Sequence, residues 1–274
     1  MLRLPFAKGH GTGNDFVIVP DPGGDVDLTA EMVVALCDRH RGVGADGLLR
    51  VVRTTGHVDT AGEAVGPAWF MDFHNADGSR AEMCGNGVRV YARYLVESGL
   101  AAGPRIPILT AAGPVVADVS SDSVAVDMPV TTVYGQSSAV VSGVDYVGTI
   151  VTCGNPNLVC RVDEPAKLDL SRPPQVDASA FPHGANVEFV GPTETDGEVL
   201  RVRMRVVERG VGETLSCGSG ACAVAAAVLA GEDRASGTVT VETLGGPLTV
   251  TIADGRTVLA GPAVIVATGE VRLP

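Results

Sequence analysis

Two short segments of this chain repeat one pattern, in which a cysteine directly precedes a Gly-x-Gly turn. They are residues 83–87 (MCGNG) and 216–220 (SCGSG), one in each half of the sequence. Both turns run into stretches with helical character, so Cys84 and Cys217 are expected at helix starts. The unpaired amides and the dipole of a helix start favour a thiolate and attract an anion. The repeat therefore predicts two activated thiols, each beside a site for a carboxylate.

The two halves match at further positions, in the same order. Asn75 and Glu208 each stand nine residues before the cysteine of their half, and a Gly-Asn pair before a strand-like run occurs at residues 13–14 and 154–155. These ordered matches indicate internal duplication, which predicts two similar lobes around a shared cleft, with a boundary between about residues 120 and 132. A thiol from each lobe would then flank a bound carboxylate, which is what inversion of the neighbouring carbon requires.

Hydrophobic periodicity and turn residues indicate three helices. The first is capped by Thr29, and the second follows Cys84 and is stopped by Gly99. The third follows Cys217 and is apolar on all sides over residues 221–230, so we expect it at the centre of its lobe. Strands are expected at residues 15–19, 47–52, 69–73, 124–128, 148–151, 187–190, 200–207, 239–243, 248–252 and 263–267, and a polar, Gly-rich loop at 53–67.

The composition argues against several classes of function. The net charge of −12 leaves no basic cluster to neutralise phosphates, so nucleic acid is not an expected partner. No apolar run is long enough to span a bilayer, and the first eight residues lack the apolar core of a signal peptide. We therefore expect a cytoplasmic protein with no membrane partner. The only lysines, Lys8 and Lys167, lie outside the repeated pattern, which argues against pyridoxal phosphate.

The six cysteines are expected to be reduced thiols, because a cytoplasmic chain of this size needs no disulfides. They form no Cys-x-x-Cys pair, and the five histidines do not lie at zinc-ligand spacing from them. We therefore expect no metal site. The four cysteines outside the repeated pattern are expected to be small buried hydrophobic residues: Cys37, Cys153, Cys160 and Cys222.

Six ordered blocks of the sequence resemble the motifs of the diaminopimelate epimerases, and together they extend over nearly the whole chain. In the first half the blocks are residues 10–16 (HGTGNDF), 39–47 (RHRGVGADG) and 75–87 (NADGSRAEMCGNG). In the second half they are residues 154–156 (GNP), 186–189 (NVEF) and 208–220 (ERGVGETLSCGSG).

The resemblance implies cofactor-independent epimerisation of LL-2,6-diaminopimelate to the meso isomer, in lysine and peptidoglycan-precursor biosynthesis, by a homodimer. Cys84 and Cys217 would be the proton acceptor and donor, exchanging parts with the direction of the reaction. An ordinary thiol pKa of about 8.5 suits this, since modest tuning leaves one thiolate and one thiol near neutrality. The implied substrate contacts are the backbone at Gly85, Asn86, Gly218 and Ser219 for the reacting carboxylate, and Asn14, Asn75, Asn155, Asn186, Glu208 and Arg209 for the distal end.

Individual residues support these implied parts to different degrees. Arg209 suits a carboxylate through its bidentate fork. Asn75 precedes an Asp-Gly pair, and without the resemblance we would interpret it as a turn residue. Glu208 has a second expected part, which is to adjust the ionisation of Cys217.

The chain departs from the family pattern at two positions. Asn157 stands where the family commonly has a histidine that would lie near the first cysteine and tune its pKa. Asparagine can hydrogen-bond a thiol but cannot exchange protons near neutrality, so activation of Cys84 is expected to depend on the helix start. Gly47 stands where some members carry a glutamine, so one distal contact is expected to be absent or replaced.

Three alternatives stay open. A proline or hydroxyproline racemase shares the fold and the two cysteines, but usually carries histidine at the position of Asn86 and lacks the opening at residues 10–16. A non-catalytic amino-acid-binding protein on the same scaffold would be expected to have lost a cysteine. A redox pair would form a disulfide across an empty cleft, which we expect to be inactivating damage.

The expected fold is α/β, with two pseudo-symmetric lobes, each a curved mixed β-sheet or barrel wrapped around a central helix. The N-terminal lobe, over residues 1–127, carries Cys84, and a C-terminal strand at residues 264–274 is expected to return to it. The C-terminal lobe, over residues 128–263, carries Cys217.

Overall fold

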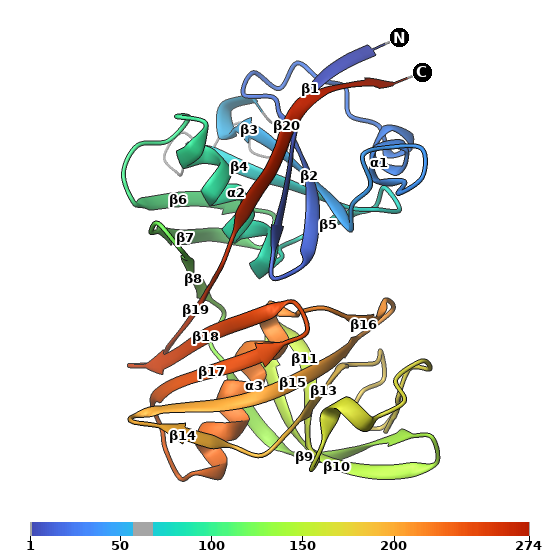
Figure 1. Cartoon of the computed structure of the whole chain (residues 1–274), viewed down its shortest axis with the longest axis vertical. Helices are drawn as coiled ribbons and strands as arrows, with labels where there is room; N and C mark the ends of the chain where they lie inside the picture. The colour runs from blue at the N-terminus through green and yellow to red at the C-terminus, as the bar shows by residue number, and fades with distance from the viewer. Residues whose placement is uncertain (1, 57–67, 274) are drawn as a thin grey trace. The chain divides into compact units, whose positions relative to one another are not determined.

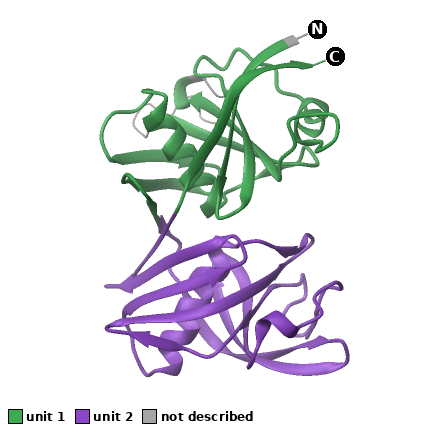
Figure 2. Cartoon of the chain, in the orientation of Figure 1, with its two compact units in different colours: residues 1–126, 262–274 green, residues 127–261 purple. Residues whose placement is uncertain are grey.

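The computed structural model describes residues 2–56 and 68–273, and the chain divides into two compact units (Figure 1). Unit 1 comprises Met1–Val126 with Pro262–Pro274, and unit 2 comprises Asp127–Gly261, as coloured in Figure 2. The two ends of the chain meet in unit 1. There β20 (Val264–Leu273) pairs antiparallel with β1 (Leu2–Gly11), so the last strand completes the sheet that the first strand begins.

Unit 1 is built on one mixed sheet. Its strand order is β20-β1-β2-β3-β4-β6-β7-β8, with the short β5 paired to β4. Only the neighbours β2–β3 and β4–β6 run parallel, and all the others are antiparallel. The further strands of this unit are β2 (Asn14–Pro20), β3 (Gly47–Arg53), β4 (Trp69–Asn75), β5 (Arg80–Ala81), β6 (Arg105–Thr110) and β7 (Gly113–Val119). The last strand, β8 (Val124–Met128), begins in unit 1 and ends with the first residues of unit 2.

Unit 2 repeats this arrangement with different strands. Its order is β9-β10-β11-β13-β15-β17-β18-β19, and again only the third and fifth pairs, β11–β13 and β15–β17, are parallel. The identical pattern of neighbours supports the internal duplication predicted from the sequence. The strands are β9 (Thr132–Val141), β10 (Val144–Cys153), β11 (Asn155–Arg161), β12 (Gln175–Val176), β13 (Asn186–Val190), β14 (Glu194–Asp196), β15 (Val199–Glu208), β16 (Gly212–Thr214), β17 (Gly237–Thr243), β18 (Gly246–Ala253) and β19 (Arg256–Gly261).

Each sheet curves around one helix. In unit 1, α2 (Gly85–Glu97) packs against β1, β2 and β7, and in unit 2, α3 (Gly218–Gly231) packs against β10, β11 and β17 (Figure 1). Residues 220–229 of α3 are all buried, which confirms the prediction of a central, wholly apolar helix. Such a helix is stable only when strands cover it on every side. The mixed α/β fold with a curved sheet and few helices is therefore as expected.

The third helix, α1 (Ala30–Cys37), covers the outside of unit 1. Its cap is Thr29, whose hydroxyl accepts a hydrogen bond from the Met32 amide at 3.3 Å, as the sequence predicts. Val33 and Leu36 on its buried side join the core of unit 1 together with Leu4, Val17 and Leu48. Two short 3-10 turns, η1 (Thr54–Gly56) and η3 (Pro165–Lys167), complete the described elements.

Several strands escape prediction from the sequence. The most important is β1, in which Pro5 and Gly9 weaken the local signal for a strand. It forms because it pairs with β20 at the far end of the chain. Long-range pairing of this kind has no local signature. The polar loop predicted for residues 53–67 lies largely outside the described residues. In the described part of the chain, no helix has the length and apolar character needed to cross a membrane.

Candidate active site

The two repeated cysteines occupy equivalent positions at the starts of α2 and α3. Cys84 is the N-cap of α2 with φ −139° and ψ 121°, and Cys217 is the N-cap of α3 with φ −128° and ψ 122°. The first amides of a helix have no carbonyl partner within it, so each start offers donors to an anion. The predicted placement of both cysteines at helix starts is confirmed.

Around Cys84, the side chain of Asn14 joins the thiol to the helix. Its Oδ1 lies 3.7 Å from the Cys84 Sγ, which donates to it, and also accepts from Nδ2 of Asn86 at 3.3 Å. Its own Nδ2 donates to Oδ2 of Asp46 at 2.9 Å. The structure thus brings Asn14, Cys84 and Asn86 together, and Asp46 fixes which way the Asn14 amide points.

An ion cluster behind Asn14 makes that orientation rigid. Arg39 bridges Asp15 at 2.8 Å and Asp46 at 2.6 Å, and Lys8 reaches Asp15 at 2.7 Å. Burial raises the pKa of Asp15, but the hydrogen bonds from Arg39 and Lys8 outweigh it and hold that pKa well below its usual range. Asp15 is therefore a carboxylate at neutral pH. This cluster explains why sequence blocks far apart in unit 1 meet at Cys84.

Around Cys217, the central side chain is Asn186 at the start of β13. Its Nδ2 lies 3.1 Å from Oδ1 of Asn157, to which it donates, and 4.0 Å from the Cys217 Sγ. Its Oδ1 accepts from the backbone amide of Arg209 at 3.0 Å. The hydroxyl of Ser219 lies 3.5 Å from the same sulfur. Four residues predicted from the sequence and the pKa-modulating position 157 therefore form one connected group.

Several groups around Cys217 act on the pKa of its thiol. Burial raises the pKa of this thiol well above its ordinary value, and the nearby carboxyls of Glu208 and Glu188 raise it further. The Ser219 hydroxyl and the Gly220 amide act in the opposite direction but do not compensate. The sequence analysis expects one thiolate and one thiol near neutrality, and the raised pKa favours the thiol form for Cys217. The carboxyl group of Glu208 contributes to that rise.

Asn157 makes defined contacts within its own unit. It is fully buried on β11 of unit 2, where its Nδ2 donates to the Asn155 carbonyl at 2.8 Å and its Oδ1 accepts from Asn186. Its expected influence on Cys84 of unit 1 stays a prediction. The interpretation supported by the contacts is that Asn157 orients the Asn186 amide.

We expect Asn157→Ala to lower kcat/KM for the reaction proposed below by about five- to tenfold, because one buried neutral hydrogen bond contributes about 1 kcal/mol. Asn157→His should retain more activity, since an imidazole nitrogen can accept from Asn186, and should add a titration to the acid limb of kcat/KM. The pH profiles of the two variants and the wild type provide the measurement. Equal losses with unchanged profiles would contradict this part for position 157.

Three predicted substrate residues have exposed side chains that point away from these groups or join them only through the backbone. Asn75 is exposed and donates from Nδ2 to the Ser79 hydroxyl at 3.0 Å, which is what a turn residue does. Asn155 is exposed at the hairpin between β10 and β11. The guanidinium of Arg209 is exposed as well, held only by a bond of 3.4 Å to the His183 carbonyl. Their proposed contacts with substrate stay predictions.

Gly47 leaves no room for the larger residue of some family members. A Cβ at this position would lie 2.8 Å from the His74 carbonyl oxygen and 2.9 Å from the Phe73 ring. The pairing of β3 with β4 is therefore tight at Gly47, opposite Asn75. Glycine has no side chain, so position 47 itself cannot supply the distal substrate contact that a glutamine would make in some family members.

One residue near Cys217 was missed in the sequence. Glu188 lies two residues after Asn186 on β13 and is fully buried. The signal was available, because an acidic residue interrupts the apolar run at residues 187–190 and shares the strand face of Asn186. Glu188 is considered further below.

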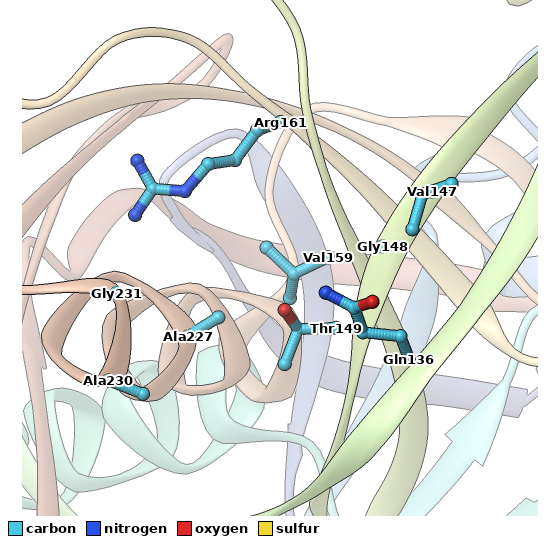
Figure 3. A pocket seen from close by; sticks show the side chains of 9 residues that line it. All are labelled: Gln136, Val147, Gly148, Thr149, Val159, Arg161, Ala227, Ala230 and Gly231. Carbon is cyan, nitrogen blue, oxygen red and sulfur yellow. The ribbon is translucent and has the colours of Figure 1, made fainter.

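Other features of the molecule lie away from the cysteines. A pocket of about 370 Å³ opens in unit 2 between β10, β11 and the last turn of α3, with Arg161, Gln136 and Thr149 as its polar lining (Figure 3). It lies at the C-terminal end of α3, about 15–20 Å along the helix from Cys217. Among the described residues, no three His, Cys, Asp or Glu side chains could share a metal ion.

All six cysteines lie in the described ranges, and none of them is joined to another by a disulfide. The four that we expected to be buried hydrophobic residues are buried, which confirms that prediction. Cys84 is half-buried, and burial alone does not separate the two site cysteines from the others because Cys217 is only 5% exposed.

Comparison with known proteins decides the family. The sequence profile of the diaminopimelate epimerases matches residues 6–133 and 149–273. The diaminopimelate epimerase of Thermobifida fusca is 50% identical over 279 aligned positions, which cover 98% of both chains. This chain belongs to the diaminopimelate epimerase family.

Solved structures with low sequence identity share the fold. A phenazine biosynthesis protein of the PhzF family from Bacillus anthracis superposes with a TM-score of 0.73 at 16% identity, covering all of both chains. A hydroxyproline epimerase from Agrobacterium vitis, solved with bound trans-4-hydroxy-L-proline, superposes with a TM-score of 0.61 at 16% identity, covering 98% of this chain and 91% of the other. At such identities the likeness concerns the fold alone.

Proposed function

We propose that this protein is a diaminopimelate epimerase, an isomerase that interconverts LL-2,6-diaminopimelate and the meso isomer without a cofactor. The observation that carries the proposal is the pair of equivalent N-cap cysteines, one in each unit, in a chain of this family. A two-base inversion needs a thiol at each face of the α-carbon, and each unit supplies one.

The proton transfers follow from the two thiols. In the direction from LL to meso, the Cys84 thiolate removes the α-proton and the Cys217 thiol delivers its proton to the opposite face. Cys84 then carries a proton and Cys217 is a thiolate, which is the form that the reverse reaction needs. The raised pKa of the Cys217 thiol, caused first by burial, supports its role as the proton donor in the first direction.

The helix starts supply the stabilisation that a cofactor would otherwise provide. The α-C–H bond is a very weak acid, and negative charge spreads onto the α-carboxylate as the proton leaves. Preorganised amides at Gly85–Asn86 and Gly218–Ser219 would hold that carboxylate more strongly as its charge grows. Exclusion of water from the closed site would strengthen those dipoles.

The distal amino-acid end of the substrate is assigned to a second set of side chains. The Arg209 guanidinium would bind the distal carboxylate through two parallel hydrogen bonds, and the Glu208 carboxylate would accept from the distal ammonium. Asparagine amides can serve both groups, because each has a donor and an acceptor. The proposed set is Asn14, Asn75, Asn155, Asn186, Glu208 and Arg209.

Proton NMR in D2O tests the proposal directly. Reduced protein without added cofactor is incubated with LL-diaminopimelate in one tube and with L-proline in another. Loss of the α-proton signal together with appearance of the meso isomer, and no change in the proline tube, is the expected result. Exchange in the proline tube alone would reassign the protein to the racemases that share this fold. No exchange in either tube, with six free thiols confirmed, would overturn the proposal.

The setting of the enzyme is also part of the proposal. The reactive thiols need a reducing compartment, which agrees with the expected cytoplasmic location. The homodimer implied by family resemblance is to be measured by light scattering on the purified protein.

A further inference from the structure

The carboxyl group of Glu188 is buried in an unusual way. Its side chain is fully inaccessible on β13, between Val187 and Phe189, and no other described residue donates a hydrogen bond to its carboxyl oxygens. Burying a carboxyl group without a partner is unfavourable, and an uncompensated charge there is far more so. A position that only needed filling would be served better by an apolar residue.

Glu188 lies directly beneath the start of the Cys217 helix. A Cβ on Gly220 would lie 2.6 Å from the Glu188 Oε1 and 3.3 Å from the Cys217 Cβ. The absence of a side chain at Gly220 therefore allows the carboxyl group to reach the first turn of α3 beside Cys217. Gly220 is the third residue of α3 after the N-cap Cys217, so the Glu188 carboxyl group lies against the first turn of this helix.

The equivalent position in unit 1 shows what packing alone requires. Register pairs Phe16 with Gly47 on β2 and β3, as it pairs Asn157 with Asn186 on β11 and β13. Two residues further along the strand, Leu49 is therefore the counterpart of Glu188. A Cβ on Gly87 would lie 3.4 Å from the Leu49 Cδ2 and 3.5 Å from the Cys84 Cβ. A leucine is sufficient to fill the space beneath the Cys84 helix. Packing alone therefore does not explain why an acid occupies the equivalent space beneath Cys217.

The groups that face Glu188 are themselves acids. From β15 comes the carboxyl group of Glu208, and from the start of α3 comes the thiol of Cys217. The thiol of Cys160 lies on the other face of the sheet, and Glu188 adds to the rise of its pKa through space. Burial first, and Glu208 second, raise the pKa of Glu188 well above its usual range. Burial therefore favours the uncharged form of Glu188, and negative charge on any one of these groups opposes charge on the next.

We propose that Glu188 is a positioning residue for the reaction: it loses its own proton before Cys217 does, and its buried carboxylate then keeps the Cys217 thiol protonated into the alkaline range. At neutral pH the Glu188 carboxyl group is uncharged, so Cys217 can become a thiolate during turnover without repulsion from a negative charge on Glu188. At higher pH the ionised acid prevents the resting enzyme from losing the proton that Cys217 must donate. The part that Glu188 takes in catalysis rests on the proposed function, but its effect on Cys217 does not.

The first test titrates Cys217 without substrate. In protein labelled with 13C at cysteine Cβ, the Cys217 signal is assigned by its absence from Cys217→Ser and followed with pH. Glu188→Gln keeps the shape of the side chain and removes its charge, so the Cys217 midpoint should fall by about one pH unit. The same substitution at the exposed Glu194 of unit 2 is the matched control and should leave the midpoint unchanged. An unmoved Cys217 midpoint in Glu188→Gln would overturn the proposal.

The second test follows both directions of the reaction. In the direction from LL to meso, where Cys217 must be a thiol, the alkaline limb of kcat/KM should move to lower pH in Glu188→Gln. In the reverse direction, where Cys217 must be a thiolate, the acid limb should also move to lower pH. A merely structural part for Glu188 would reduce the rate without moving either limb, which would count against the proposal.

Folding of the variants is controlled by a second substitution. If Glu188→Gln does not fold, Glu188→Leu copies the residue that unit 1 uses and carries the same titration. If neither folds, Glu188 is required for structure and the proposal falls. A wild-type protein that leaves diaminopimelate unchanged would refute the proposed function alone, because the cysteine titration needs no substrate.

Discussion

Cys84→Ala and Cys217→Ala are each expected to lower kcat for epimerisation by at least about a thousandfold, the upper part of the range for loss of a positioned acid or base. Each cysteine is the N-cap of its helix, and neither start holds a second thiol that could replace it. One thiol cannot serve both faces of the α-carbon, so each variant should fail in both directions.

The two variants should still differ from each other in D2O. Cys217→Ala retains the base for the LL isomer, so slow exchange of the α-proton without formation of the meso isomer is expected from LL substrate. Cys84→Ala should show that exchange only from the isomer on which Cys217 acts as base. Proton NMR records exchange and inversion separately. Inversion at near wild-type rate in either variant would refute the two-base mechanism.

Two other buried cysteines are matched controls for these substitutions. Cys37 lies in the core of unit 1 and Cys160 in the core of unit 2, and burial raises the pKa of the first to about 11 and of the second to about 12. Both are therefore unreactive thiols. Cys37→Ala and Cys160→Ala should reduce stability by the modest amount that a small cavity costs, with kcat unchanged.

Arg209→Ala is expected to raise KM for diaminopimelate by about 10- to 100-fold with little change in kcat, because a charge-assisted hydrogen bond contributes about 1.5–3 kcal/mol. The exposed guanidinium has few competing contacts, so it is available to a carboxylate. Its backbone amide already holds the Asn186 side chain, and that bond survives the substitution.

Steady-state kinetics of Arg209→Ala, Arg209→Lys and Arg203→Ala test this part. Lysine keeps the charge but not the fork, so Arg209→Lys should lie between the wild type and Arg209→Ala. Arg203 is exposed on β15, which ends one residue before Arg209, and it pairs loosely with Glu194 at 3.9 Å, so its loss should leave KM unchanged. An unchanged KM in Arg209→Ala would remove this residue from the distal site.

The sequence predicts the features whose cause is local. A cysteine before a Gly-x-Gly turn and an amphipathic or wholly apolar run predicts a helix start, and both cysteines are N-caps in the structure. Thr29 as a cap and Gly99 as a stop are equally local, and Gly99 adopts the left-handed φ of +71° that suits the end of α2. Repeated blocks in the same order were enough to indicate duplication.

Features that depend on distant partners were not predictable in this way. The pairing of β1 with β20 joins the two ends of the chain, and no local pattern in residues 2–11 announces it. Asn157 has no sequence feature that connects it to Asn186, because that contact arises only from the parallel pairing of β11 with β13.

The identity of the reactive groups was thus readable from the order of the residues, whereas their protonation was not. A helix start favours a thiolate wherever it occurs, and this argument from sequence applies equally to Cys84 and Cys217. The pKa of Cys217 depends on burial and on carboxyl groups brought close by β13 and β15. Those contributions act through space in a medium of low dielectric constant, so they exist only once the strands have paired around α3.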